Sequence, residues 1–157
     1  MRSMKRSSGF TMVELVMVIV IVGILSAAAF PRFSGNSIFQ ARGFADQVLA
    51  TLRYAQKTAI AQHRLVCVSL NNTTPATVTL TIASFDSAGN CGVGVALALP
   101  DRAGNILTAP TDITLNTTEA ALTFDALGRA STTVAITIPD PDGDIAITVE
   151  AETGYVH

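Results

Sequence analysis

One long apolar segment near the start of the chain limits what the rest of it can be. From Phe10 to Phe30 the only polar residues are Thr11, Glu14 and Ser26. A helix of this length extends for ~32 Å, which is enough to cross a hydrocarbon core of ~30 Å. We therefore expect residues 10–31 to form a membrane-spanning helix.

The charges before this segment predict its orientation and leave two interpretations open. Arg2, Lys5 and Arg6 precede it, and no Lys or Arg lies within it, a pattern that keeps the N-terminus in the cytoplasm and exports the rest. A cleavable secretory signal peptide has similar charges, and "SAAAF" at residues 26–30 is similar to its cleavage site. Hydropathy alone does not separate the two.

Glu14 does separate them. An ionised carboxylate inside a membrane helix is costly and normally meets a partner, although at a helix start it also interacts favourably with the helix dipole. Together with the basic leader and the order Gly9-Phe10-Thr11, this glutamate resembles the N-terminal signature of type IV prepilins and pseudopilins.

The resemblance implies a processing site and an assembly residue. In that family a prepilin peptidase removes the leader, here residues 1–9, by cutting between Gly9 and Phe10. The new amine of Phe10 is methylated, and Glu14 pairs with the N-terminal amine of a neighbouring subunit during filament assembly. Pro31 matches a proline that kinks the helix near the membrane surface.

Residues 32–64 carry the pattern of an amphipathic helix that runs to about His63. Apolar residues recur there at three- and four-residue steps: Ile38, Ala41, Ala45, Val48, Leu52, Ala55 and Ala59. The charged residues of this segment fall largely on the opposite, solvated face: Arg42, Asp46, Arg53 and Lys57. The small alanines favour close packing of the apolar face against a sheet.

Residues 65–157 change to short β-branched or alternating runs, separated by Asn, Thr, Pro and Gly. Strands are expected at 65–70, 77–83, 93–99, 113–115, 122–124, 132–138 and 145–151, and "GYVH" closes the chain. The last two runs flank a hairpin with Asp142–Gly143 at its tip. One long helix followed by these strands predicts an α+β fold in which an antiparallel sheet covers the helix.

Further motifs show which group of pilin-like proteins the chain resembles most. The segment "ARGFADQVLATLRYAQKTAIAQHRLVCVSL" resembles the helix and first strand of GspH/FimT-type minor pilins. "LTFDALGRAS" (122–131) is similar to the Phe-Asp-x-x-Gly turn of that domain, and residues 154–156 are similar to its closing Gly-x-Val strand. The helix and the Cys67 strand most resemble the C-type minor pilins of mannose-sensitive haemagglutinin (MSHA) pili. The resemblance implies a type IV pilin-like fold.

Cys67 and Cys91 both follow the apolar segment. If this part of the chain is exported, an even pair favours one disulfide. Two buried free thiols are the alternative.

Candidate ligand sites are few. Asp140, Asp142 and Asp144 surround Gly143 and suggest a loop site for calcium, but the spacing of an EF-hand is not met. A solvated hairpin tip is the simpler interpretation. The only histidines are His63 and His157, and no catalytic set is formed by sequence neighbours. We expect no cofactor and no enzymatic activity.

The sequence therefore predicts a minor pilin that takes part in assembly, initiation or tip structure of a type IV pilus and supports adhesion. Its expected location is the bacterial inner membrane, with a single span and a periplasmic head, and then the pilus. Expected partners are other pilins, the prepilin peptidase, the assembly platform and membrane lipid. A minor pseudopilin of a type II secretion system is the nearest alternative. A signal-anchored periplasmic enzyme or binding protein is a further alternative, but the residues that such a site would need are missing from this sequence.

A DNA-uptake pilin is a further alternative, and the charge of the head argues against it. After residue 64 only Arg102 and Arg129 face ten carboxylates. Because binding to nucleic acid requires clustered cations, we expect no nucleic-acid partner.

Overall fold

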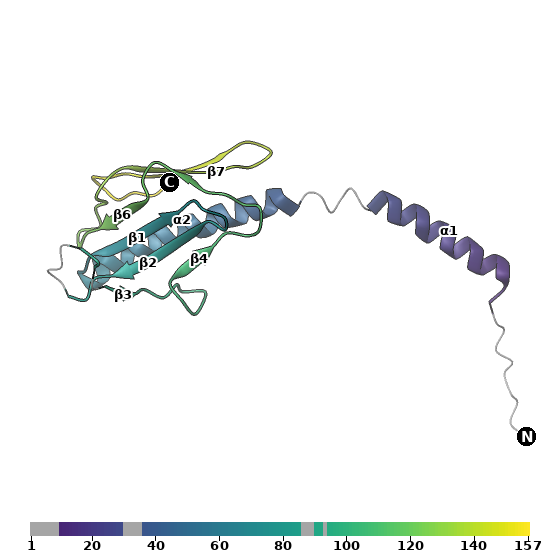
Figure 1. Cartoon of the computed structure of the whole chain (residues 1–157), viewed down its shortest axis with the longest axis horizontal. Coiled ribbons are helices and arrows are strands. Elements are labelled where there is room, and N and C mark those ends of the chain that lie inside the picture. The colour runs from purple at the N-terminus through teal and green to yellow at the C-terminus, as the bar shows by residue number, and fades with distance from the viewer. Residues whose placement is uncertain (1–9, 30–35, 86–89, 93) are drawn as a thin grey trace, which may run out of the picture. The chain divides into compact units, whose positions relative to one another are not determined.

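The computed structural model describes residues 10–29, 36–85, 90–92 and 94–157, and it divides the chain into two compact units, Met1–Asn36 and Ser37–His157 (Figure 1). Among the described residues of the first unit lies the helix α1, Met12–Ala29. The segment expected to cross a membrane, residues 10–31, continues into residues 30 and 31, which lie outside the described ones.

Large apolar side chains lie on all sides of α1. Those from Phe10 to Leu25 are between 49% and 81% exposed. A helix that is apolar all round requires cover from lipid or from other protein. Within the described ranges, no helix is both long enough and apolar enough to span a membrane.

The second unit contains α2, Asn36–Gln62, apart from its first residue. One face of α2 is buried, and it contains the predicted apolar residues Ala41, Ala45, Val48, Leu52, Ala55 and Ala59. Phe44, which was not predicted, is buried with them, whereas the predicted Ile38 is only half-buried. The helix ends in a Schellman motif, because Arg64 N donates to Ala59 O at 3.1 Å and His63 N to Ile60 O at 3.4 Å. His63 takes the left-handed position of that motif, with φ of 50°.

The first sheet is antiparallel and has the strand order β3-β2-β1-β6, with β4 also paired to β2. Its strands are β1 (Val66–Asn71), β2 (Thr77–Ile82), β3 (Val95–Ala96), β4 (Ile106–Thr108) and β6 (Ala121–Phe124). β3 and β4 share one edge of β2, with Val95 opposite Ile82 and Ile106 opposite Thr79. Between them the chain leaves the sheet and reaches α2, where Arg102 Nη2 donates to Gln47 Oε1 at 3.2 Å.

The second sheet has the order β5-β7-β8. Its strands are β5 (Asn116–Thr117), β7 (Val134–Ile138) and β8 (Ile145–Val149). The end of the chain covers the free edge of β8, since the backbones of Thr148 and His157 exchange hydrogen bonds of 2.7 and 3.0 Å.

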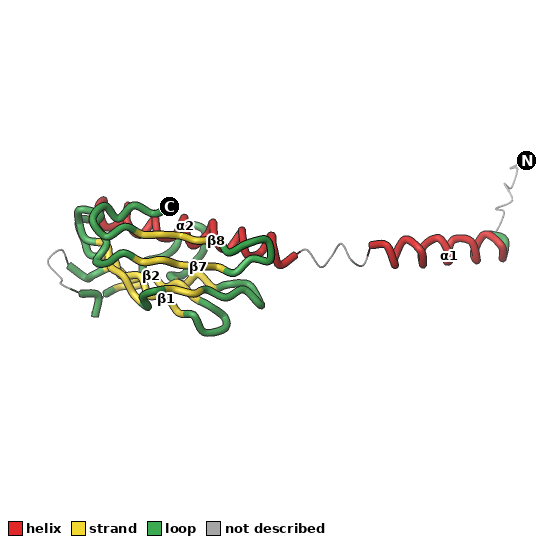
Figure 2. The backbone as a smooth tube through the Cα atoms, turned by 90° about the horizontal axis from the view of Figure 1, so that it is seen from above, coloured by secondary structure: helices red, strands yellow, loops and turns green. Residues whose placement is uncertain are grey.

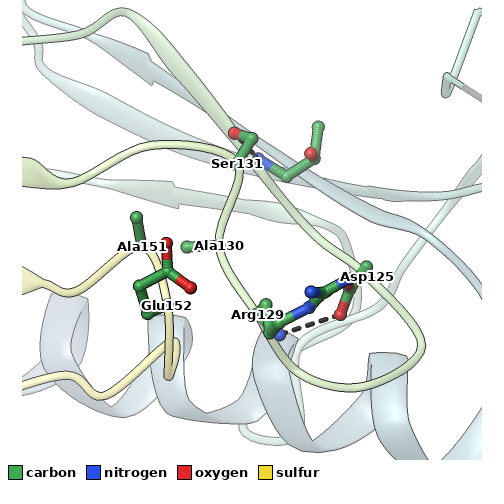
Figure 3. A pocket seen from close by; sticks show the side chains of 7 residues that line it. Asp125, Arg129, Ala130, Ser131, Ala151 and Glu152 are labelled. Atoms are coloured by element: carbon green, nitrogen blue, oxygen red, sulfur yellow. Dashed lines mark hydrogen bonds and ion pairs between the residues drawn. The ribbon is translucent and has the colours of Figure 1, made fainter.

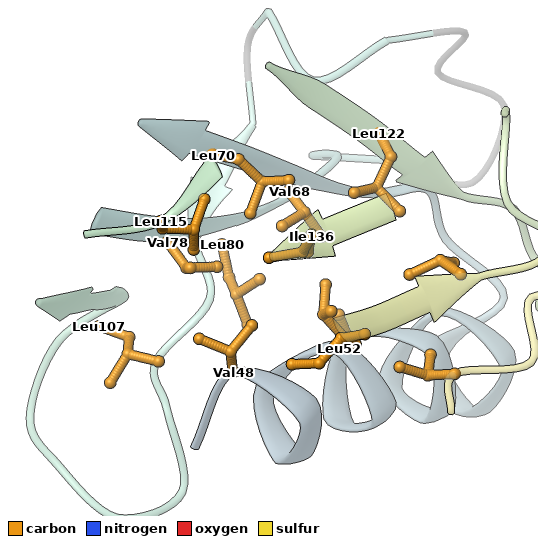
Figure 4. Close-up of a cluster of buried hydrophobic side chains, with 14 of the residues drawn as sticks. Val48, Leu52, Val68, Leu70, Val78, Leu80, Leu107, Leu115, Leu122 and Ile136 are labelled. Atoms are coloured by element: carbon orange, nitrogen blue, oxygen red, sulfur yellow. The ribbon is translucent and has the colours of Figure 1, made fainter. Parts of the chain in front are cut away.

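The helix α2 and the two sheets enclose one hydrophobic core (Figure 4). Val48 and Leu52 of α2 point into it, towards Leu80 of β2 and Ile136 of β7. Buried and exposed residues alternate along the longer strands, as expected for sheets with one solvated face. Seen from above, the strands of this unit lie along one side of α2 (Figure 2).

The α+β class, the helix end and the β7–β8 hairpin agree with the sequence predictions. Three details differ. The strands form two sheets rather than one. Residues 113–115 form no strand, although Ile113 and Leu115 are buried, and the unexpected β4 precedes them. In the run at 93–99, whose first residue lies outside the described ones, the strand β3 covers Val95–Ala96, and Leu97 N adds one bond to Leu80 O at 3.2 Å.

Candidate functional site

Glu14 lies in the first turn of α1, one turn after the residue that caps the helix. Thr11 Oγ1 accepts the N–H of Glu14 at 3.3 Å, and Thr11 O accepts the N–H of Leu15 at 3.1 Å. This Thr-x-x-Glu order is that of a capping box. Phe10 and Glu14 are both exposed, whereas Gly9 and Pro31, the predicted cleavage and kink residues, lie outside the described residues.

The disulfide between Cys67 and Cys91 is present, with 6.1 Å between the Cα atoms. Cys67 lies on β1, opposite Thr81 of β2 and Thr123 of β6. Cys91 belongs to the segment between β2 and β3. The bond therefore ties that segment to the middle of the first sheet, and neither cysteine is a free thiol.

Two of the three hairpin aspartates bind an arginine of α2. Arg42 Nε lies 3.2 Å from Asp140 Oδ2, and Arg42 Nη2 lies 3.4 Å from Asp142 Oδ2. The side chain of Asp140 is 1% exposed and also accepts the N–H of Asp142. Over the described ranges, no three acidic, histidine or cysteine side chains are grouped to hold a metal ion. Arg42 already supplies a charge partner for Asp140 and Asp142, and the calcium site at Asp140, Asp142 and Asp144 stays a prediction.

Gly128 of the Phe-Asp-x-x-Gly turn and Gly154 of the closing Gly-x-Val segment lie against each other. A Cβ on Gly154 would collide with the carbonyl oxygen of Gly128, and a Cβ on Gly128 would collide with Ile60 of α2. Gln56 Nε2 completes the junction by donating to Gly128 O at 3.0 Å and to Thr153 O at 3.1 Å. The turn after β6, the chain end and α2 are therefore joined at one point.

An open hollow of about 280 Å³ lies beside this junction (Figure 3). It is lined by Thr123, Asp125, Arg129, Ala130, Ser131, Ala151 and Glu152. Asp125 forms an ion pair of 2.9 Å with Arg129 and accepts the backbone N–H groups of Leu127 and Arg129. Partial burial raises the pKa of Asp125, but these hydrogen bonds outweigh it and hold the pKa below its ordinary value. The carboxylate thus holds the turn together and is not free for a ligand.

The long-range bonds of α2 have no local signal in the sequence. The helical spacing predicts Arg42 and Arg53 on the solvated face, and both are exposed, but each also binds a residue near the end of the chain. Arg53 donates from Nε and Nη2 to Val156 O, at 3.2 and 2.9 Å, and so holds the end of the chain. Helical spacing indicates which face is exposed and says nothing about partners a hundred residues away.

Two family descriptions match the chain. Residues 4–30 match the prokaryotic N-terminal methylation motif, and residues 45–153 match the type II transport protein GspH. In pilins the first motif marks an N-terminal membrane anchor.

Solved structures share the fold at low sequence identity. The type IV minor pilin FimU of Pseudomonas aeruginosa is 16% identical with a TM-score of 0.55, over 74% of this chain and 85% of that one. The minor pseudopilin EpsH from the Type 2 Secretion System of Vibrio cholerae is 17% identical with a TM-score of 0.59, over 75% and 94% of the two chains. These likenesses establish a type IV pilin-like α+β fold.

Proposed function

The chain belongs to the GspH family of type II transport proteins, and from this we propose that it is a minor pilin that takes part in assembly, initiation or tip structure of a type IV pilus. The observation that carries the proposal is the order of the two motifs in one chain. A methylation motif at residues 4–30 precedes a GspH domain at residues 45–153. This order is the one required of a subunit with a filament-forming helix and a globular head.

The proposed processing follows from the N-terminal motif. A prepilin peptidase cuts between Gly9 and Phe10, and the amine of Phe10 is methylated. The cut leaves the apolar α1 in the mature chain and places an ammonium group close to Glu14. Because opposite charges attract strongly in an apolar environment, Glu14 pairs with the N-terminal amine of a neighbouring subunit. The bond from Glu14 N to Thr11 Oγ1 uses only the backbone of Glu14 and is compatible with this role of its carboxylate.

The proposed location is the inner membrane, with residues 10–31 as a single-pass anchor and the head in the periplasm. The Cys67–Cys91 disulfide supports an oxidising compartment for the head. Proposed partners are other major and minor pilins, the assembly platform in the inner membrane and membrane lipid. The role is structural, with no catalytic step assigned to any residue.

A minor pseudopilin of a type II secretion system is the second candidate. It is favoured by the family description and by the likeness to EpsH. If the protein is a minor pilin, we propose that its pilus is of MSHA type and has a role in adhesion. This proposal rests on the amino-acid sequence of the helix and of the strand that contains Cys67. A DNA-uptake role remains disfavoured by ten carboxylates against two arginines after residue 64.

The test replaces Glu14 in a deletion strain and follows the chain into sheared pili. Glu14→Ala keeps the leader and Gly9, so the chain should still be inserted and cleaved, but it should be lost from pili because the buried ammonium of its neighbour is unpaired. Glu14→Gln keeps shape without charge and should fail in the same way. Met17→Leu, on the same helix, is the matched control and should enter pili normally.

The phenotype of the deletion strain separates the two candidates. Loss of surface pili with normal protein secretion supports the pilin, whereas loss of secretion with normal surface pili supports the pseudopilin. Normal incorporation of both Glu14 variants would contradict the assigned role of Glu14.

A further inference from the structure

A shallow hollow lies on the exposed side of α2. It has a volume of about 340 Å³ and is lined by Leu49, Ala50, Arg53, Tyr54 and Lys57. Its floor is fixed, because Leu49 and Tyr54 pack against the core and the Tyr54 hydroxyl donates to Ala98 O at 3.2 Å. The hollow is therefore a preformed apolar surface with two cations at its rim.

The two cations have no carboxylate partner in the part of the chain that the structure describes. The Arg53 side chain binds only the carbonyl oxygen of Val156, and the Lys57 side chain takes part in no hydrogen bond or ion pair among the described residues. They lie four residues apart on one helix, a spacing at which like charges destabilise the helix. Arg53 offsets this cost through its bonds to Val156 O, whereas the Lys57 side chain makes no bond among the described residues that would offset it.

Four exposed acidic side chains without an ion-pair partner among the described residues lie in residues 65–157, outside α2. Asp112, Glu119, Asp144 and Glu152 are exposed and belong to none of the ion pairs between described residues. These four carboxylates lie in loops and turns, whereas Arg53 and Lys57 lie on α2, whose exposed face also carries Asp46. An exposed carboxylate of one subunit can therefore meet the two cations of another.

We infer that the hollow at Arg53 and Lys57 binds an acidic segment of a neighbouring pilin-type subunit, with a carboxylate between the two cations. The inference rests on the proposed function and adds the chemistry of the partner. A protein segment is favoured over nucleic acid because two cations make few phosphate contacts, whereas nucleic-acid binding accumulates many. The apolar floor also favours a side chain over a free anion.

The experiment places a photo-reactive amino acid at Ala61, which is exposed and lies one turn beyond Lys57. The full-length chain is expressed in a deletion strain, and pili are irradiated, sheared and analysed by mass spectrometry. We expect an adduct with one segment of a pilin-type subunit that contains Asp or Glu. Lys57→Glu should lower the yield of this adduct roughly tenfold, as expected for loss of a close charge pair, and Lys57→Arg should retain it.

Two controls make the result specific. Asn72→Asp lowers the net charge by one unit, half of the change made by Lys57→Glu, at an exposed turn outside the hollow, and should leave the yield unchanged. Changing the identified carboxylate of the partner to Lys should restore the adduct with Lys57→Glu.

The outcomes distinguish the inference from the proposed function. An unchanged yield with Lys57→Glu, a partner segment without a carboxylate, or an adduct with lipid or nucleic acid would overturn the inference alone. Absence of the wild-type chain from both pili and secretion-system assemblies would overturn the proposed function and the inference with it.

Discussion

Arg42 and Asp140 join the start of α2 to the β7–β8 hairpin, with Nε and Oδ2 3.2 Å apart across 98 residues of sequence. The Asp140 side chain is almost fully buried and the Arg42 side chain is 59% exposed. A buried carboxylate depends on its partners, because losing one leaves a desolvated charge.

Arg42 also pairs with Asp142, and the buried Asp140 and the exposed Asp142 should respond differently to replacement by Asn. Asp140→Asn should lower the free energy of unfolding by about 1–3 kcal/mol. Asp142→Asn should change it by less than about 0.5 kcal/mol, because the Asp142 side chain is 59% exposed. Thermal unfolding of the purified protein in detergent measures both. Equal effects would show that burial of Asp140 does not matter.

The disulfide should stabilise the head measurably. Its cysteines are 24 residues apart, so the bond should contribute about 3 kcal/mol by restricting the unfolded chain. Reduction should lower Tm by on the order of 10 °C for a head of this size. The double variant Cys67→Ser, Cys91→Ser should melt at the temperature of the reduced protein, with and without reductant. A wild-type Tm that does not respond to reductant would contradict this.

The contact between Gly128 and Gly154 leaves no room for a side chain. Gly154 has φ of 63°, and an added Cβ would meet the carbonyl oxygen of Gly128. Gly154→Ala should lower the free energy of unfolding by about 2–4 kcal/mol. Gly43→Ala is the matched control, because Gly43 lies in α2 with open space around it. That change should stabilise the protein by about 0.5–1 kcal/mol. Similar losses at both positions would show that the close contact is not what requires Gly154.

The turn after β6 should be sensitive to acid. The pKa of Asp125 is lowered in the folded state, so its contribution is present above the unfolded pKa of about 4 and disappears as the pH falls through the folded value. The wild-type protein should exceed Asp125→Asn in stability near pH 6, and the difference should shrink below about pH 4. Denaturant titrations across this range measure it. A difference that is constant with pH would mean that the charge of Asp125 has no role.

Local sequence patterns were sufficient to predict the elements that have a regular spacing of apolar residues or a typical turn sequence. The spacing from Ala41 to Ala59 predicted α2 and its buried face, and the Asp142–Gly143 turn predicted the β7–β8 hairpin. Both depend on neighbours in sequence. The N-terminal motif was also visible, because its leader, Gly9 and Glu14 lie within a few residues of one another.

Contacts between distant segments could not be predicted in this way. β4 has three residues and owes its existence to the open edge of β2. Alternation within a strand shows which face is buried but not which sheet the strand joins, so the division into two sheets was missed. The bonds from Arg42, Arg53 and Gln56 to the head depend on the packing of the whole unit.

The mature N-terminus tests the central claim most directly. The chain should be recovered from sheared pili or membranes and its intact mass and N-terminal peptide determined by mass spectrometry. A minor pilin processed as proposed begins at Phe10, with a methylated amine and the whole of α1 retained. A chain that begins beyond Ala27 would be the product of an ordinary signal peptidase, and that result would contradict the account.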